Sequence, residues 1–323
     1  MDLLLPILYT IVPAALIAAT PLLLTAMGGL FSERSGVVNI GLEGLMVMGA
    51  FGGIVGTLYF DSLGFGAASA WMGILVAIVL GALFSLFHAV ASITLKADQI
   101  VSGVALNFLA VGLTVFIVRE VFERGQTDTI SSGARLFRIN VPFLSDIPIL
   151  GPMFFSRIYV TTYVAFALAV LVWYVVFKTP FGLRLRSVGE HPMAADTMGI
   201  KVNRMRYIGV MLSGAFAGSG GAVYAITTAG NFAGGTIVGQ GFMALAALIF
   251  GKWHPFGAMG AAVFFGFAQA LSISAQQIPG LANVPQVYML ILPYVLTILA
   301  LAGFVGKAEP PKALNQPYEK GSR

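Results

Sequence analysis

The feature that most constrains this chain is a series of long apolar runs separated by short polar segments. A helix needs about 20 predominantly apolar residues to cross the hydrocarbon core of a bilayer. Eight of the nine runs are long enough, whereas the run at 238–250 is short and flanked by glycine, as in a broken or re-entrant helix. The runs fall near residues 3–30, 38–60, 69–95, 99–118, 158–177, 207–227, 238–250, 256–276 and 285–306.

The composition points to the same class of protein. Hydrophobic residues make up 58% of the chain and charged residues only 10%, whereas a soluble domain has roughly 25% charged residues. We therefore expect an all-α polytopic membrane protein with about eight to ten transmembrane helices, some of them broken or re-entrant. The chain has no cysteine, and His88, His191 and His254 lie far apart in the sequence. The sequence thus predicts no disulfide, no metal site and no catalytic residue.

The distribution of positive charge predicts the orientation of the chain. Six Lys or Arg residues lie between residues 178 and 206, and four more lie in 307–323. Cytoplasmic loops of membrane proteins collect Lys and Arg, so both segments should be cytoplasmic and the long loop 119–157 external. The same bias explains the net charge of +5 without a nucleic acid as partner. We expect one transmembrane domain over 1–306, including a cytoplasmic segment at 179–206, and then a cytoplasmic tail at 307–323.

The cytoplasmic segment carries the pattern of a short helix. Pro192 suits the first turn of a helix, "MAADTMG" follows, and Gly199 supplies a stop. Its apolar face would dock into a groove on a cytoplasmic partner, or it would rest on lipid headgroups. The residues of that face are Met193, Ala194, Thr197 and Met198.

This segment also resembles a known family. "GLRLRSVGEHPMAADTMGI" is similar to the coupling segment of ABC-importer permeases in the branched-chain amino acid, simple sugar and nucleoside group, with His191 where Asn is usual. "ERSGVVNIGLEGLMVMGA" and "GQGFMALAALIFGKWHPFGA" resemble the branch that takes up guanosine and other nucleosides. The resemblance assigns contact with the ATPase to Arg186, Gly189, Glu190, His191, Pro192, Ala194, Ala195, Gly199 and Ile200.

The resemblance implies a permease subunit of an ATP-driven nucleoside importer in the bacterial cytoplasmic membrane. Its partners would be a second, related permease subunit, two cytoplasmic ATP-binding subunits, an external substrate-binding lipoprotein and membrane lipid. The lipoprotein would dock on the loop 119–157 and the turns near 228–237. The chain has no Gly-x-x-x-x-Gly-Lys-Ser/Thr phosphate loop. It would therefore have no cofactor and no enzyme activity, and ATP and Mg²⁺ would be used by the partner ATPase.

Three other functions compete with this one. A permease of the same group for ribose-like sugars or branched-chain amino acids would have a similar sequence. An ion-coupled secondary transporter would need carboxylates at membrane depth, and Glu43 is the one strong candidate. An integral membrane enzyme would need clustered catalytic side chains, which the sequence does not offer.

Polar residues predicted at mid-membrane depth are candidates for the substrate pathway. Glu43 lies ten residues beyond Glu33, or about 15 Å along a continuous helix, and Asn39 would share its face. Asn107 lies about 13 Å beyond Asp98 by the same rise. All three would line the pathway, contact the ligand, or anchor one helix to another through hydrogen bonds.

A second group of candidates lies near residues 231–242. Asn231 and Gln240 would line the outer part of the pathway or simply end a polar loop, and Phe232 would stack on a base or pack in the core. In "SGAFAGSGGAVY", Gly214 and Gly218 form the small-xxx-small pattern of closely packed membrane helices.

Overall fold

A computed structural model describes residues 4–275 and 309–320, with single positions between 284 and 298. Within the described residues, seven helices are long and apolar enough to cross a membrane. The run at 238–250 forms only the short helix α10 (Gln240–Phe250), as its flanking glycines predicted. Most of the predicted crossing at 285–306 lies outside the described residues.

The long helices follow the predicted apolar runs closely, because a buried or lipid-facing helix satisfies every backbone group internally. Two of them continue into short π-helices, η2 (Val90–Thr94) and η4 (Ala225–Ala229). The long helices are α1 (Leu4–Arg34), α2 (Leu42–Ser62), α3 (Ser69–Ala89), α4 (Gln99–Phe122), α6 (Val160–Lys178), α9 (Val202–Tyr224) and α11 (Pro255–Ser274).

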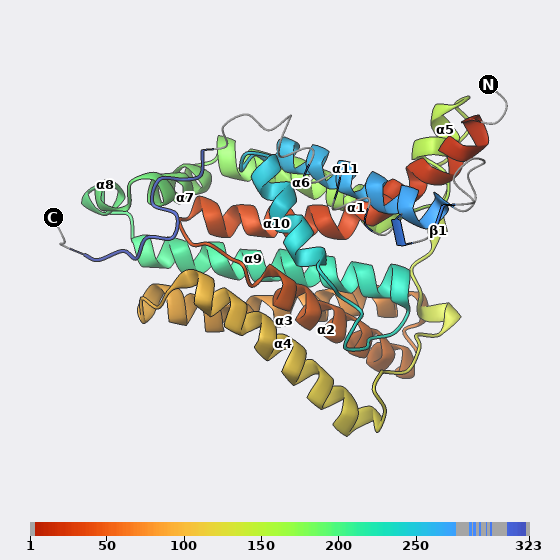
Figure 1. Ribbon diagram of the computed structural model, residues 1–323, viewed down its shortest axis with the longest axis horizontal. Coiled ribbons are helices and arrows are strands. Elements are labelled where there is room, and N and C mark those ends of the chain that lie inside the picture. Colours follow the sequence, from red (N-terminus) through yellow and green to blue (C-terminus); the bar gives the residue numbers. More distant parts are fainter. Residues whose placement is uncertain are drawn as a thin grey trace.

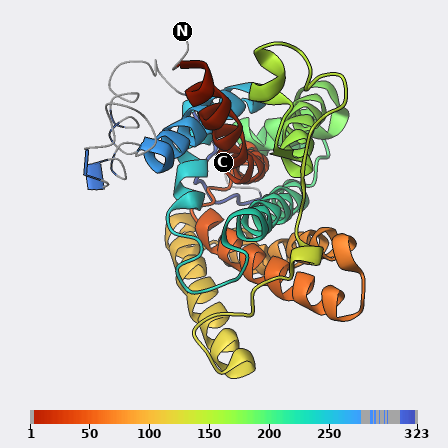
Figure 2. The same cartoon turned by 90° about the vertical axis from the view of Figure 1, so that its right-hand side faces the viewer.

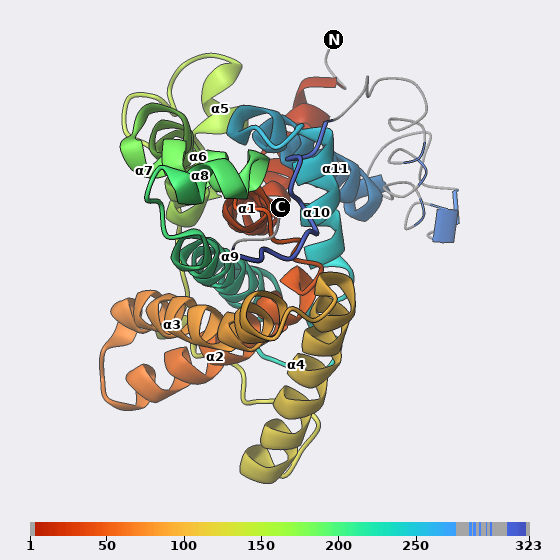
Figure 3. The same cartoon turned by 90° about the vertical axis from the view of Figure 1, so that its left-hand side faces the viewer.

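The helices pack in two layers that share α9. On one side of α9, the central helix α1 packs against α6, α10 and α11; on the other side lie α2 and α3. Figure 3 shows α1 surrounded by these neighbours, and Figure 2 shows α4 standing apart at the edge of the α2–α3 layer. The glycine face of α9 makes the close approach: a Cβ on Gly218 would lie 2.4 Å from the Ala77 carbonyl oxygen. The predicted small-residue packing is confirmed.

The two ends of the bundle differ in the segments that they carry. At one end lie α7 (Pro180–Glu190), α8 (Pro192–Thr197) and the tail 309–320, and at the other lie the N-terminus and the segment between α4 and α6 (Figure 1). We call these the coupling end and the outer end. The segment 179–206 and the tail thus lie at the end opposite the segment between α4 and α6. That the coupling end is cytoplasmic stays a prediction.

The segment at the outer end contains a few short elements. A 3₁₀ turn (Ser132–Ala134), strand β1 (Arg138–Ile139), helix α5 (Leu150–Phe154) and strand β2 (Ile158–Tyr159) follow in order. β1 and β2 pair antiparallel, with Arg138 opposite Tyr159. These two short strands are the departure from the all-α expectation among the described residues. A second 3₁₀ turn (Gly66–Ala68) precedes α3.

The chain between α1 and α2 is not helical. Residues 35–41 form turns and extended backbone, and Gly36 has a positive φ of 90°. The expectation that Asn39 and Glu43 share a helix face is therefore wrong, because Asn39 precedes the first residue of α2. The depth calculated for Glu43 along a continuous helix fails for the same reason.

Candidate translocation and coupling sites

The start of α2 is capped by a side chain from α4. The Oδ1 atom of Asn107 accepts a hydrogen bond from the Gly44 backbone N–H at 2.7 Å, and its Nδ2 donates to the Ile40 carbonyl at 3.1 Å. A helix beginning inside a bundle leaves N–H groups that need partners, and Asn107 supplies one. Its contacts are those of a helix-to-helix anchor.

Glu43 does for α10 what Asn107 does for α2. Its two carboxylate oxygens each accept a hydrogen bond at 2.6 Å, one from the Gly239 N–H and one from the Gly241 N–H. These groups open α10, where a negative charge also interacts favourably with the helix dipole. Since α10 has 11 residues, the helix is about 16 Å long from end to end. Glu43 therefore sits near mid-membrane depth after all, and its contacts match the anchoring alternative.

The remaining candidates have different surroundings. Asn39 donates a hydrogen bond to the Ser213 hydroxyl of α9 at 2.9 Å. Phe232 is buried and packs edge-to-face on Phe51, with ring centroids 5.6 Å apart. Asn231 is half-buried in the loop between η4 and α10. Gln240 lies deeper than the outer position expected for it, because it is the first residue of α10.

A cavity of about 590 Å³ lies between α1, α9, α10 and α11 and reaches the segment at the outer end. We call it the outer cavity. Of the six pathway candidates, Gln240 lines it, and the other five do not. Its lining includes the polar and aromatic residues Tyr9, Tyr224, Thr228, Gln240, Gln269 and Ser272.

The coupling end presents α7 and α8 as a hairpin. Thr179 caps α7 by accepting a hydrogen bond from the Gly182 N–H, and Pro192 opens α8 as predicted. α8 ends in a Schellman motif: the Gly199 N–H donates to the Asp196 carbonyl at 2.9 Å, and the Ile200 N–H donates to Ala195 at 3.0 Å. Gly199 has a φ of 80°, which favours glycine. The predicted helix and its stop are confirmed, whereas α7 was not predicted.

The hairpin has an exposed face and a buried one. Met198 is 81% exposed and Met193 39% exposed, while Ala195 is buried against the bundle. Ala194, His191 and Gly199 are also exposed. α8 therefore offers an apolar surface to a partner, as its sequence pattern indicated.

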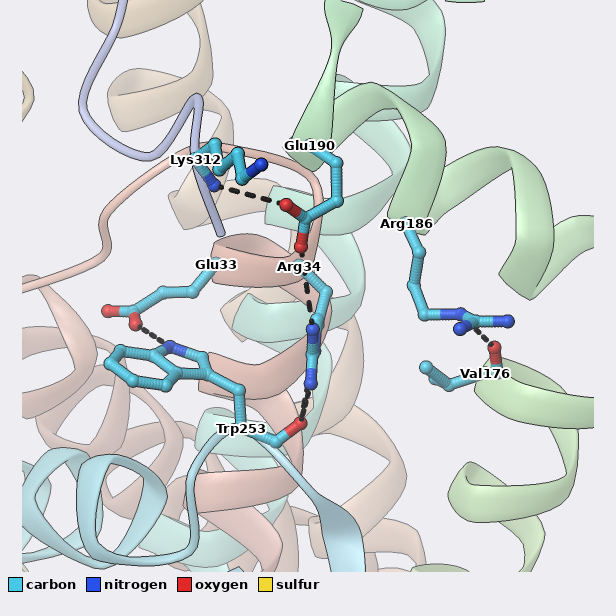
Figure 4. A network of polar contacts seen from close by, with 7 residues as sticks. All are labelled: Glu33, Arg34, Val176, Arg186, Glu190, Trp253 and Lys312. Carbon is cyan, nitrogen blue, oxygen red and sulfur yellow. Dashed lines mark hydrogen bonds and ion pairs between the residues drawn. The ribbon is translucent and has the colours of Figure 1, made fainter. Parts of the chain in front are cut away.

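Figure 4 shows how the hairpin is joined to the bundle. The guanidinium of Arg34, at the end of α1, donates two hydrogen bonds to the Trp253 carbonyl, at 3.0 and 2.8 Å. Its third nitrogen lies 3.9 Å from a Glu190 carboxylate oxygen. The Trp253 indole donates to Glu33 at 2.5 Å. α1 thus holds the turn between α10 and α11 on one side and α7 on the other.

Arg186 and Gly189 complete this junction. Arg186 donates to the Val176 carbonyl at 3.1 Å and lies over the Phe177 ring. A Cβ on Gly189 would stand 2.3 Å from the Arg34 carbonyl oxygen, so a larger residue would push α7 away. His254 follows Trp253 outside the membrane-spanning part of α11, and burial together with nearby Arg34 lowers the pKa of its imidazole.

The C-terminal tail closes over the same junction. The Ala313 N–H donates to the Gly189 carbonyl at 2.9 Å, and the buried Arg206 donates to the Gln316 carbonyl at 2.9 Å. Lys96, between α3 and α4, donates to Glu319 at 2.7 Å and holds the pKa of that carboxyl below its usual value. The tail therefore contacts α7, α9 and the α3–α4 turn.

The family of the chain follows from comparison with known sequences. Residues 11–301 match the family described as "Branched-chain amino acid transport system / permease component". The chain belongs to this permease family. It is a multi-pass membrane transport component and not an enzyme.

Comparison with individual proteins gives relatives within this family. The chain is 60% identical to the guanosine ABC transporter permease protein NupQ of Bacillus subtilis, over 98% of each chain. It is 49% identical to the nucleoside ABC transporter permease protein NupC of Lactococcus lactis, over 97% of this chain and 98% of that protein. A second Bacillus subtilis protein, the guanosine ABC transporter permease protein NupP, is 27% identical over 89% of this chain and 81% of its own length.

In this permease, α10 connects the outer cavity with the coupling end. Its first residue, Gln240, lines the cavity, and Glu43 holds its first turn. The turn after its last residue contains Trp253, which Glu33 and Arg34 hold. Hydrogen bonds from α1 and α2 therefore hold both ends of the short helix α10.

Sequence reasoning missed several residues of this arrangement. Trp253, Arg206 and Gln269 carry contacts between elements far apart in the chain, and no local pattern marks such partners. The position of Arg206 in the sequence could have marked it, because a charged side chain on a membrane helix needs a partner.

Proposed function

We propose that this permease forms the translocation pathway of an ATP-driven nucleoside importer. The observation that carries the proposal is the exposed α7–α8 hairpin, joined through Arg34 and Trp253 to α10. It provides a docking surface and a mechanical connection to the bundle interior. The nucleoside specificity is supported by the 60% and 49% identity to permeases named for guanosine and nucleosides.

Coupling would proceed through the hairpin. An ATPase docks on the residues assigned to it from Arg186 to Ile200, with Met193 and Met198 as its apolar contacts. When the ATPase closes, the hairpin moves, and Glu190 pulls on Arg34. Arg34 moves the Trp253 turn and thereby α10. Packed elements that contact one another in series can carry such coupling through the molecule. Substitution of Arg34 tests this route.

The remaining partners complete the importer. A second, related permease pairs with this chain, as the occurrence of two guanosine permease proteins in Bacillus subtilis supports. An external substrate-binding lipoprotein docks at the outer end, on 119–157 and the turns near 228–237. ATP and Mg²⁺ are used by the ATPase, and this chain needs no cofactor.

The orientation and domain division are part of the same proposal. The coupling end and the C-terminal tail are cytoplasmic, in a bacterial cytoplasmic membrane, because Lys and Arg gather there. The transmembrane domain covers 1–306, and the tail covers 307–323.

The test is transport by the reconstituted complex. The permease, its second permease and the ATPase are placed in proteoliposomes with the binding lipoprotein, and uptake of labelled guanosine is measured. We expect uptake that requires ATP and is competed by nucleosides, not by ribose or leucine. Uptake driven by a proton gradient without ATP contradicts the proposal, and stronger competition by ribose or leucine reassigns the substrate.

A further inference from the structure

Two glutamine side chains meet in the outer cavity. The Nε2 of Gln269, on α11, donates a hydrogen bond at 3.3 Å to the Oε1 of Gln240, on α10. Gln240 is only 7% exposed. The other amide atoms, Nε2 of Gln240 and Oε1 of Gln269, have no hydrogen-bond partner among the described residues, and both residues line the cavity. The pair therefore leaves a hydrogen-bond donor and an acceptor together in a largely buried place.

A donor beside an acceptor matches the edge of a nucleobase. Proteins read an unpaired base through hydrogen bonds to its pairing edge and by stacking on its face. A carboxamide presents both functions, and it turns over to match a base whose donor and acceptor are exchanged. The two glutamines can thus accommodate several bases.

The walls of the cavity supply what the rest of a nucleoside needs. Tyr9 and Tyr224 offer aromatic faces, on which bases stack. Ser272 offers a hydroxyl group suited to ribose. Arg138 and Arg157, at the outer end, are the charged residues among the described residues that line the cavity, and none of those lining residues is acidic. The volume of about 590 Å³ is in the range of small-molecule sites.

We propose that the outer cavity is a nucleoside-binding site of the permease itself, in which Gln240 and Gln269 bind the edge of the base. The inference rests on the proposed nucleoside transport and names the site where the substrate pauses. Because Gln240 begins α10, a bound base contacts the same helix that Arg34 and Trp253 hold at the coupling end. Occupation of the cavity is thereby sensed by the element that the ATPase moves.

The experiment uses the absence of native cysteine. Thr228→Cys places one thiol on the exposed wall of the cavity, and Ser62→Cys places one on the exposed end of α2, outside the cavity. The assembled importer in nanodiscs, without ATP, is labelled with a water-soluble maleimide in the presence or absence of inosine, a soluble purine nucleoside. We expect inosine to slow labelling at position 228 several-fold and to leave position 62 unchanged. Ribose should protect neither position.

Substitutions at the two glutamines then test whether their side chains bind the nucleoside. Gln240→Leu or Gln269→Leu, added to Thr228→Cys, should raise the inosine concentration needed for half-protection about tenfold, since one hydrogen bond is lost. The control Gln316→Leu, exposed at the coupling end, should not.

Three results overturn the inference. They are equal labelling with and without inosine, protection by ribose equal to that by inosine, and unchanged protection in both Gln→Leu variants. The importer that carries Thr228→Cys alone is first shown to import guanosine with ATP. Failure of that parent importer contradicts the proposed function, whereas the three results above contradict the binding site alone, so the two failures are distinguishable.

Discussion

Glu43 is a carboxylate buried in an apolar bundle, and its partners are two backbone N–H groups at the start of α10. Burial of a charge is costly unless hydrogen bonds and dipoles replace water. Here the benefit is mutual, because a half-helix that begins inside the membrane also needs acceptors for its first N–H groups. The hydrogen bonds of Asn107 and Glu43 go to the first turns of α2 and α10, as expected for residues that anchor one helix to another.

The contacts of Glu43 predict which of two substitutions at this position costs more stability. Glu43→Leu leaves two buried N–H groups unpaired and should cost about 2–6 kcal/mol of stability, at 1–3 kcal/mol each. Glu43→Gln keeps one acceptor oxygen and should cost about half as much. The measurement is thermal unfolding in detergent, with Glu120→Gln on the exposed face of α4 as the control. Equal loss in both Glu43 variants would instead show that the charge itself is required.

Among the elements, α8 is the one whose local sequence most directly determines its exposed surface. Six helical residues end in a Schellman motif, and the exposed methionines on either side form its apolar surface. The shape of that surface depends on the left-handed conformation of Gly199, since the chain turns there into α9.

Substitution of Gly199 should weaken docking without unfolding the bundle. A non-glycine residue at this φ costs about 1 kcal/mol, and a β-branched one more. Gly199→Val should therefore reduce ATPase binding about fivefold or more, measured by co-purification and by stimulated ATP hydrolysis. Gly260→Ala, on a helix surface with open space around it, is the matched control. Normal transport in Gly199→Val would argue against the docking role of α8.

The elements also show what the sequence can predict. Long apolar runs predicted the helices, and Pro192 with Gly199 predicted α8, because these signals are local. The apolar run at 38–60 did not reveal that its helix begins only at Leu42, so Asn39 was wrongly placed on the face of Glu43. Of the pathway candidates predicted from the sequence, Gln240 alone lines the outer cavity. Gln269 was not predicted, because it reaches Gln240 only through the packing of α11 on α10.

At the scale of the whole molecule, the tail holds the coupling end together. It contacts α7, α9 and the α3–α4 turn. Arg206 is 1% exposed and donates a hydrogen bond to the carbonyl of Gln316 in the tail. The tail is thus a clasp across both layers of the bundle, rather than an appended end.

Removal of residues 309–323 should lower the melting temperature by several degrees, because it leaves the buried Arg206 without the Gln316 carbonyl. Arg206→Met in the truncated chain should recover part of the loss, since an apolar side chain needs no partner there. Differential scanning fluorimetry of the full-length chain, the truncated chain and the truncated Arg206→Met chain checks both statements. A melting temperature unaffected by truncation would show that the tail contacts are not stabilising.

The central claim is that ATPase motion reaches the bundle interior through Arg34, which joins α7 to the turn after α10. The most direct test is the number of guanosine molecules imported per ATP hydrolysed by the reconstituted importer. In Arg34→Met we predict near-normal ATP hydrolysis and a tenfold or greater fall in this ratio. Arg204→Met, an exposed arginine at the same end, should keep the wild-type ratio. An unchanged ratio in Arg34→Met, with both activities retained, would contradict the claim.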